Sequence, residues 1–144
     1  RLDLIGGHID AGAVDADAFS PARRKTLTEI ALARGLQPAD AVIDHSAVVA
    51  RSSRIGEGSF VNTMAVVGAM SMIDEGVLIN RSASLGHHCI IDDFVSIGPG
   101  VTMAGNTRVG SDTVIGAGAA LARADRRDHS PRTSVAADLD PVSI

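Results

Sequence analysis

The stretch INRSASLGHHCIIDDFVSI, residues 79–97, places a large aliphatic residue at every sixth position: Ile79, Leu85, Ile91 and Ile97. The same frame extends in both directions, from Ile43 to Leu121, and each of its positions holds Val, Ile, Leu or Met. A period of six matches neither the 3.6 of an amphipathic helix nor the simple alternation of a strand. It indicates a solenoid in which a short strand and a corner recur with every hexapeptide.

A second register supports this interpretation. The residue four positions after each aliphatic is small or β-branched, as at Ser71, Ala83 and Cys89. Gly, Asp or Asn often follows the aliphatic directly, and these residue types suit corners and tight turns. Three hexapeptides would close one triangular coil, with one aliphatic on each side pointing inward and successive coils about 4.8 Å apart. A β-sandwich is disfavoured, because it requires a period of two with irregularly spaced turns.

We therefore predict a mainly β fold, a parallel β-helix of hexapeptide repeats, over residues 41–121. The proteins known to us with this pattern wind with a left hand, although the period alone does not fix the hand. After Leu121 the frame fails, since its next positions would be Arg127, Thr133 and Leu139. We expect residues 122–144 to form an irregular tail or a cap over the open end of the solenoid.

Residues 20–36, SPARRKTLTEIALARGL, predict a helix ahead of the solenoid. Ser20 suits the N-cap, Pro21 suits the first helical position, and Gly35 suits the C-terminal stop. The spacing of three apolar residues predicts one buried face, formed by Leu27, Ile30 and Ala31.

Composition narrows the classes of function. The 144 residues carry 13 Lys and Arg against 17 Asp and Glu, and no basic stripe stands out, so nucleic acid is not an expected partner. No apolar run approaches the length of a transmembrane helix, so no membrane partner is expected either. The single cysteine, Cys89, excludes an internal disulfide and fits a cytoplasmic location. The first residue is Arg1 rather than Met, so an earlier targeting segment remains open.

Two adjacent histidines, His87 and His88, stand out in this apolar sequence. His87 follows the inward-facing Leu85 by two positions, so it falls at a corner and should project outward. An unperturbed imidazole has a pKa of about 6.5, which suits a group that accepts a proton near neutral pH. Gly105 follows His87 by three hexapeptides and should therefore lie directly one coil away.

A histidine-ligated zinc site is the alternative that these residues raise. Zinc in a catalytic site needs three protein ligands and an open fourth position. His45 precedes His87 by seven hexapeptides, which is not a whole number of three-hexapeptide coils, so the two do not stack. We therefore expect no metal.

The sequence of residues 79–119 resembles the sialic-acid O-acetyltransferase (NeuD/PglD-type) family of hexapeptide-repeat sugar acyltransferases. The points of match are Asn80, Leu85-Gly86-His87, Cys89, Asp93-Phe94, Ile97, Ala104-Gly105-Asn106 and Ile115-Gly116-Ala117-Gly118. Residues 42–61 are also typical of the family. Residues 22–36 resemble the last helix of its small N-terminal nucleotide-sugar-binding domain, so residues 1–40 are expected to be a remnant of that α/β domain.

This resemblance implies an acetyl-CoA-dependent acetyltransferase that acts on an amino or hydroxyl group of a sugar, with the sugar linked to a nucleotide. It implies a homotrimer in which acetyl-CoA lies between neighbouring β-helices. The residue that matches the family's general base is His87. Gly105 would make room for the thioester, and its backbone N–H could bind the carbonyl oxygen as charge develops.

The resemblance assigns further positions. The family usually has Asp or Glu after the base, to orient it, and here His88 takes that place as catalytic support. The alternative support is a carboxylate such as Asp92 or Asp93, or one from the next subunit. Cofactor contacts are implied at Gly105, Ser96 and Ala117, although some members have histidine where this chain has Ser96. Asn80 is the implied substrate-binding residue.

Two other functions remain open at this point. One is an acetyltransferase acting on a small molecule that is not a sugar, because hexapeptide repeats are shared by many acyltransferases. The other is a non-catalytic trimeric scaffold, which predicts no binding of CoA. Cys89 falls in the inward register of small residues, so it is expected to pack in the core and not to act as a nucleophile.

Overall fold

The structure is a computed structural model and describes residues 19–122. Residues 1–18 and 123–144 lie outside this range, and with them nearly half of the predicted N-terminal remnant and nearly all of the predicted tail. One helix, α2 (Pro21–Ala33), precedes the strands. Each strand is a dipeptide: β1 (Val42–Ile43), β2 (Val48–Val49), β3 (Arg54–Ile55), β4 (Phe60–Val61), β5 (Val66–Val67), β6 (Met72–Ile73), β7 (Leu78–Ile79), β8 (Ser84–Leu85), β9 (Ile90–Ile91), β10 (Ser96–Ile97), β11 (Thr102–Met103), β12 (Arg108–Val109), β13 (Val114–Ile115) and β14 (Ala120–Leu121).

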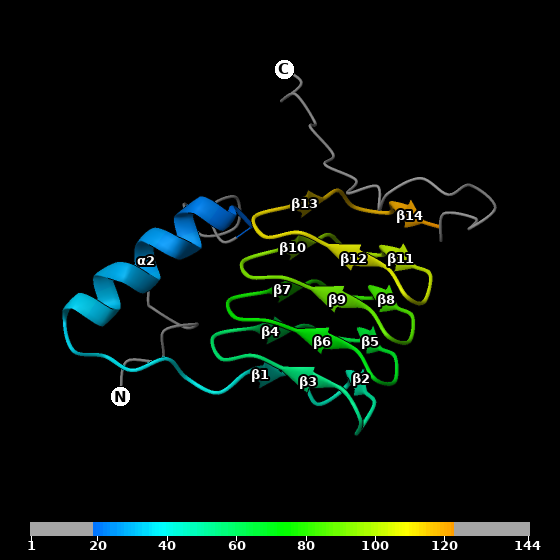
Figure 1. The fold of residues 1–144 in the computed structure, drawn as a ribbon, viewed down its shortest axis with the longest axis horizontal. Helices are drawn as coiled ribbons and strands as arrows, with labels where there is room; N and C mark the ends of the chain where they lie inside the picture. Colours follow the sequence, from blue (N-terminus) through cyan, green and yellow to red (C-terminus); the bar gives the residue numbers. More distant parts are fainter. Residues whose placement is uncertain (1–18, 123–144) are drawn as a thin grey trace, which may run out of the picture.

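The strands form three parallel sheets, and each sheet is one side of a triangular coil (Figure 1). The first side has the order β1-β4-β7-β10-β13, the second β14-β11-β8-β5-β2, and the third β12-β9-β6-β3. Paired residues lie three hexapeptides apart throughout, as in Val61 with Ile79 and Ile79 with Ile97. The predicted left-handed parallel β-helix, with three hexapeptides in each coil, is therefore confirmed.

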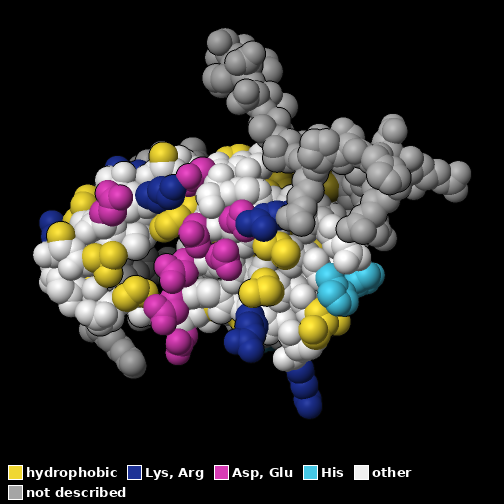
Figure 2. Space-filling view, in the orientation of Figure 1, with side chains coloured by type: hydrophobic (Ala, Val, Ile, Leu, Met, Phe, Trp, Pro, Cys, Tyr) yellow, Lys and Arg dark blue, Asp and Glu magenta, His cyan; other side chains and the backbone are white. Residues whose placement is uncertain are grey.

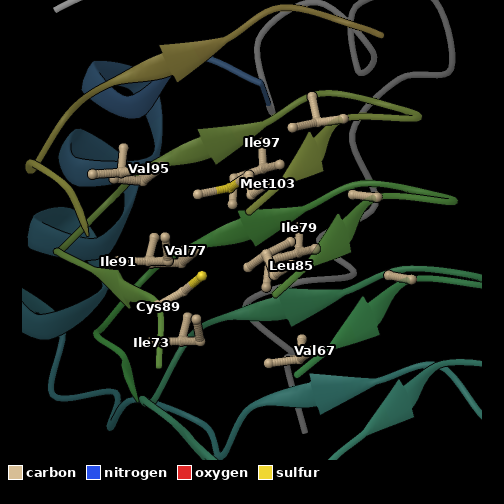
Figure 3. Packing of buried hydrophobic residues seen from close by; sticks show 14 of the residues in the cluster. Val67, Ile73, Val77, Ile79, Leu85, Cys89, Ile91, Val95, Ile97 and Met103 are labelled. Atoms are coloured by element: carbon tan, nitrogen blue, oxygen red, sulfur yellow. The ribbon is translucent and has the colours of Figure 1, made fainter. Parts of the chain in front are cut away.

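The core is the interior of the coil, and it is filled by the second residue of each strand together with the small register (Figure 3). Ile79, Leu85, Ile91 and Ile97 are almost completely buried, as the hexapeptide frame predicts. Cys89 is fully buried beside them, and burial raises the pKa of its thiol. This position agrees with packing and leaves Cys89 without access to a substrate.

Tight corners join the sides, and several hold a residue with positive φ. His88 has φ 56° and Asn106, one coil above it, has φ 60°. Close stacking adds a second constraint at Gly86, because a Cβ there would lie 2.4 Å from the backbone nitrogen of Gly105. Successive coils thus touch through their backbones at this corner, which fixes its geometry.

Helix α2 lies along the solenoid and covers part of the first side (Figure 1). Its start is as predicted: Ser20 caps it by accepting from the backbone N–H of Arg23, with Pro21 in the first turn. It ends at Ala33, and Gly35 adopts φ 78° just beyond. The predicted apolar face is wrong in part. Ala31 is buried, but Leu27 and Ile30 are exposed to the extent of 38% and 44% among the described residues.

Arg24 makes several of the contacts that hold α2 against the solenoid, beside the ion pair of Lys25 with Asp112. It donates to the carbonyl oxygens of Gly76, Phe94 and Val95 and to Oγ of Ser96 at 2.7 Å. Loss of hydration lowers the pKa of Arg24 to about 10, although Asp112 acts in the opposite direction. Helix α2 is too short and too polar to cross a membrane, and residues 19–122 contain no other helix.

Candidate active site

The corner between the second and third sides carries His87 and His88, in the turn from β8 to β9. Two backbone hydrogen bonds hold this turn between its neighbours in the stack. The N–H of His88 donates to Ala69 in the coil below at 2.8 Å, and the carbonyl of His87 accepts from Asn106 in the coil above at 2.8 Å. Both imidazoles are exposed, and Figure 2 shows histidine side chains at the edge of the solenoid opposite α2. The turn therefore presents them on a rigid base.

The two imidazoles contact each other. Their Nδ1 atoms are 2.9 Å apart, and the rings are perpendicular with centroids separated by 5.1 Å. A hydrogen bond at this distance requires one nitrogen to carry a proton and the other to present a lone pair. His88, which the resemblance names as catalytic support, thus contacts Nδ1 of His87 and not Nε2.

Gly105 lies on the other side of the His87 ring. A Cβ added at Gly105 would fall 2.8 Å from Nε2 of His87, 2.9 Å from Cε1 and 3.0 Å from Cδ2. These three nearly equal distances mean that the face of the ring, at its Nε2 end, lies over the glycine, and the lack of a Cβ at Gly105 lets it lie so close. The structure brings together His87, His88 and Gly105 as the sequence predicts.

The carboxylates considered as alternative supports lie at a different corner, between the third and first sides. Asp92 pairs with Arg108 at 2.9 Å, and Asp93 accepts from the backbone N–H of Glu75 at 3.0 Å. Both are thus engaged one side away from the His87 turn. Within residues 19–122 no carboxylate makes an ion pair with His87, so His88 is its described partner.

Asn80 and Ala117 lie at the third corner, between the first and second sides. The side chain of Asn80 accepts from the amide of Asn62 at 3.2 Å and from the backbone N–H of Arg81 at 2.8 Å. Ala117 is exposed two coils above Arg81. Strand β8 separates this corner from His87, so one chain does not bring these predicted substrate and cofactor contacts to the histidine.

Ser96 is placed differently from the expectation. It is fully buried on the first side, where its Oγ accepts from Arg24 and donates to the carbonyl of Phe19 at 2.6 Å. Its hydroxyl is thereby used to dock α2, and in this chain it is not presented to a ligand. Arg24 is the residue that sequence analysis missed, because a single arginine in a helix gives no signal of a contact with a strand far along the chain.

Apolar side chains flank the histidine corner. Val66 on the second side, Met70 in the turn below His88, and Met72 and Ile90 on the third side are all exposed. Figure 2 shows apolar side chains next to the histidines. Exposed apolar groups that gather at one edge commonly mark a surface that another molecule covers.

A metal centre finds no support in the part of the chain that the structure describes. No group of three His, Cys, Asp or Glu side chains there is arranged to hold a metal ion. The side chain of His45 is 97% exposed and lies near Asp44, away from His87.

Known structures show the same arrangement of chain. The acetyltransferase domain of PglB from Neisseria gonorrhoeae FA1090 is 33% identical to this chain, with a TM-score of 0.61 over 72% of this chain and 59% of that one. The same domain in complex with acetyl coenzyme A gives 31% identity and a TM-score of 0.60, over 72% and 60%. WeeI from Acinetobacter baumannii AYE is 26% identical, with a TM-score of 0.66 over 69% and 47%.

These comparisons define the class of protein as a hexapeptide-repeat left-handed β-helix. The chain is similar to these acetyltransferases in sequence and fold, and the predicted resemblance to hexapeptide-repeat sugar acyltransferases is confirmed. The chain spans between about half and three fifths of the length of these solved structures. No family model matches the chain, and no curated protein matches it.

Proposed function

We propose that this chain is an acetyl-CoA-dependent acetyltransferase that uses His87 as a general base toward an amino or hydroxyl group of a sugar. The observation that supports it best is the juxtaposition of Nε2 of His87 with the bare backbone of Gly105. It occurs in a chain 31% identical to an acetyltransferase domain solved with acetyl coenzyme A. A base needs an exposed lone pair with room for the reacting groups beside it, and this corner offers both.

The proposed reaction is a direct transfer. The acceptor nitrogen or oxygen attacks the thioester carbonyl while His87 Nε2 takes its proton. The new bond to carbon forms, and the carbon–sulfur bond breaks. The proton then passes from Nε2 to the thiolate, which leaves as free CoA and returns His87 to its neutral form. The backbone N–H of Gly105 has no acceptor among the described residues, so it is available to the oxygen of the tetrahedral intermediate.

Assembly as a homotrimer completes the proposal. Helix α2 covers part of the first side, whereas exposed apolar residues stand on the second and third sides, including Val66 and Met72. Packing between copies would bury them. It would also bring the corner of one copy that carries Asn80 and Ala117 toward the His87 corner of another. The co-substrate would then lie between subunits, with Asn80 toward the acceptor and Ala117 toward CoA.

The nucleotide-linked sugar is the proposed acceptor class, on the strength of the sequence similarity of residues 22–36 and 79–119 to the sugar acyltransferases. A small non-sugar acceptor is the competing class. Transfer in the cytoplasm is proposed because the sole cysteine is free and buried, as expected where thiols stay reduced.

The test begins with acetyl-CoA binding by calorimetry, on protein whose mass has been measured by light scattering. Release of the CoA thiol is then followed with amino-sugar nucleotides and, separately, with small non-sugar amines. His87→Ala should lower kcat by about 10²- to 10⁴-fold. His45→Ala is the matched control, because it removes another exposed imidazole, in the first coil, and should leave the rate unchanged.

Two outcomes contradict the proposal. A trimer that does not bind acetyl-CoA would be a scaffold, not an enzyme. A trimer that transfers acetyl groups equally well after His87→Ala would have a different base. Turnover of non-sugar amines alone would keep the chemistry and replace the acceptor class.

A further inference from the structure

In the contact between His87 and His88, one Nδ1 donates the hydrogen bond and the other accepts it. Which of the two donates decides whether His87 can act as a base. If His87 Nδ1 donates, its Nε2 carries the lone pair and can take a proton beside Gly105. If His88 Nδ1 donates, Nε2 of neutral His87 already holds a proton and cannot take another. The 2.9 Å contact permits only one of these forms at a time.

We propose that His88 is a positioning residue whose neutral Nδ1 accepts the Nδ1–H of His87, and that this contact fixes the tautomer of His87 with Nε2 free. The inference rests on the proposed function, in which Nε2 is the atom that reacts.

The surroundings of the pair give no competing partner. The turn below contributes Ala69 and Met70, and the turn above contributes Gly105 and Asn106, none of which carries a charge. On the third side Arg108 lies opposite Ile90, and its guanidinium is bound to Asp92. On the second side, the outward residues beside the turn are Val66, Ser84 and Thr102. Among described residues, His88 is therefore the group that orients the His87 ring.

The backbone supports the same conclusion. His88 adopts φ 56°, and its N–H is bound to Ala69, so the side chain starts from a fixed point. Non-glycine residues rarely adopt this conformation, with Asn, Asp and His the most frequent exceptions. The turn therefore accepts Asn, Asp or Gly at position 88 with little strain, which makes these three residues suitable replacements.

A neutral partner has a distinct consequence during the reaction. When Nε2 takes the acceptor's proton, the Nδ1–H of the resulting imidazolium donates a charge-assisted hydrogen bond to His88. No opposite charge is present among the described neighbours to favour the imidazolium further. Introducing a carboxylate at position 88 would favour it, and neutral His87 would then be lost at a higher pH.

The experiment compares wild-type protein with His88→Gly, His88→Asn and His88→Asp. Long-range ¹H–¹⁵N spectra of the imidazoles report the tautomer of His87 whether or not acetyl transfer occurs. In the wild type we expect His87 protonated at Nδ1 at neutral pH. In His88→Gly we expect this preference to be lost, with kcat down about tenfold to a hundredfold and the Kd for acetyl-CoA unchanged. Asn supplies an acceptor oxygen, so His88→Asn should restore both.

His88→Asp adds the pH readout. The acid limb of its kcat profile should move to higher pH than in the wild type, because the carboxylate favours the charged form of His87. This shift tests whether the side chain at position 88 reaches His87, because a carboxylate directed away from the imidazole into solvent would move the limb little.

The outcomes separate the two proposals. His87 protonated at Nε2 in the wild type, or an unchanged tautomer and kcat in His88→Gly, would overturn the positioning role and leave the proposed function intact. A wild type without acetyl transfer would overturn the proposed function, and the spectra alone would then decide whether His88 fixes the tautomer.

Discussion

Gly105 lies under the ring face of His87 so closely that one added methyl carbon would stand 2.8 Å from Nε2. Such a carbon cannot be accommodated unless the imidazole moves, and the three atoms that it would meet first all belong to that side chain. The first prediction is that Gly105→Ala lowers kcat by up to about a hundredfold through misplacement of the base, with the fold retained.

Thermal unfolding and acetyl-transfer rates measured together check this prediction. Gly110→Ala is the matched control, because a Cβ there meets nothing within 4 Å. An unchanged rate in Gly105→Ala would show that the ring is free to move away without consequence, contrary to the role given to Nε2.

The second prediction concerns stability at the same corner. A Cβ at Gly86 would lie 2.4 Å from the backbone nitrogen of Gly105 and 2.8 Å from the carbonyl carbon of Ala104, so the coils themselves would have to separate. Gly86→Ala should reduce the free energy of unfolding by about 1–3 kcal/mol or more, because the backbone atoms it meets cannot rotate away as a side chain could. Chemical denaturation of Gly86→Ala beside Gly110→Ala checks it. Equal stability of the two variants would mean that the coils are less tightly stacked than the structure shows.

The fold could be predicted because every side of every coil needs one aliphatic residue pointing inward, and this need recurs at every sixth position. Ile79 and Ile97 are paired in adjacent strands of one sheet, one coil apart. The spacing of the aliphatic residues therefore predicts which strands form each side. The proximity of His87 and Gly105 was predicted in the same way, because residues three hexapeptides apart stack on each other in successive coils. Position along the repeat thus predicts which residues meet.

The repeat does not predict contacts made outside it. Ser96 occupies an outward position of β10, and only the docking of α2 turns that position into a buried one. Leu27 and Ile30 follow a helical spacing but stay exposed, because Arg24 and Ala31 supply the face that meets the solenoid. The contact of His88 with His87 depends on side-chain rotation at an exposed corner, which sequence spacing does not specify.

The third prediction tests how α2 is attached. Arg24→Met keeps the apolar stem of the side chain but removes every donor to Gly76, Phe94, Val95 and Ser96. We expect a loss of about 1–3 kcal/mol, because partly buried acceptors are left without partners. Hydrogen exchange of the α2 amides should accelerate at the same time.

Arg34→Met provides the comparison, since Arg34 is an exposed residue at the C-cap of the same helix. The role of Arg24 would be refuted by equal unfolding temperatures and equal exchange rates in the two variants.

The fourth prediction concerns the acidic edge between the third and first sides, where Figure 2 shows a column of acidic side chains. Loss of hydration at this corner and the nearby carboxylates of Asp93 and Asp92 raise the pKa of Asp74 above its usual value of 3.8. The folded state therefore binds this proton more tightly than the unfolded state does. Stability is lost as the pH rises from about 4 through the raised pKa, and it stays lost at neutral pH.

Asp74→Asn should therefore raise the unfolding temperature at pH 7 and make no difference at pH 3, where the carboxyl group is protonated in both states. The gain should be below about 1 kcal/mol, because the group is exposed, and salt should reduce it. Melting curves at both pH values check this, with Glu29→Gln on α2 as the control. A gain that persists at pH 3 would show that the carboxylate's charge is not the cause.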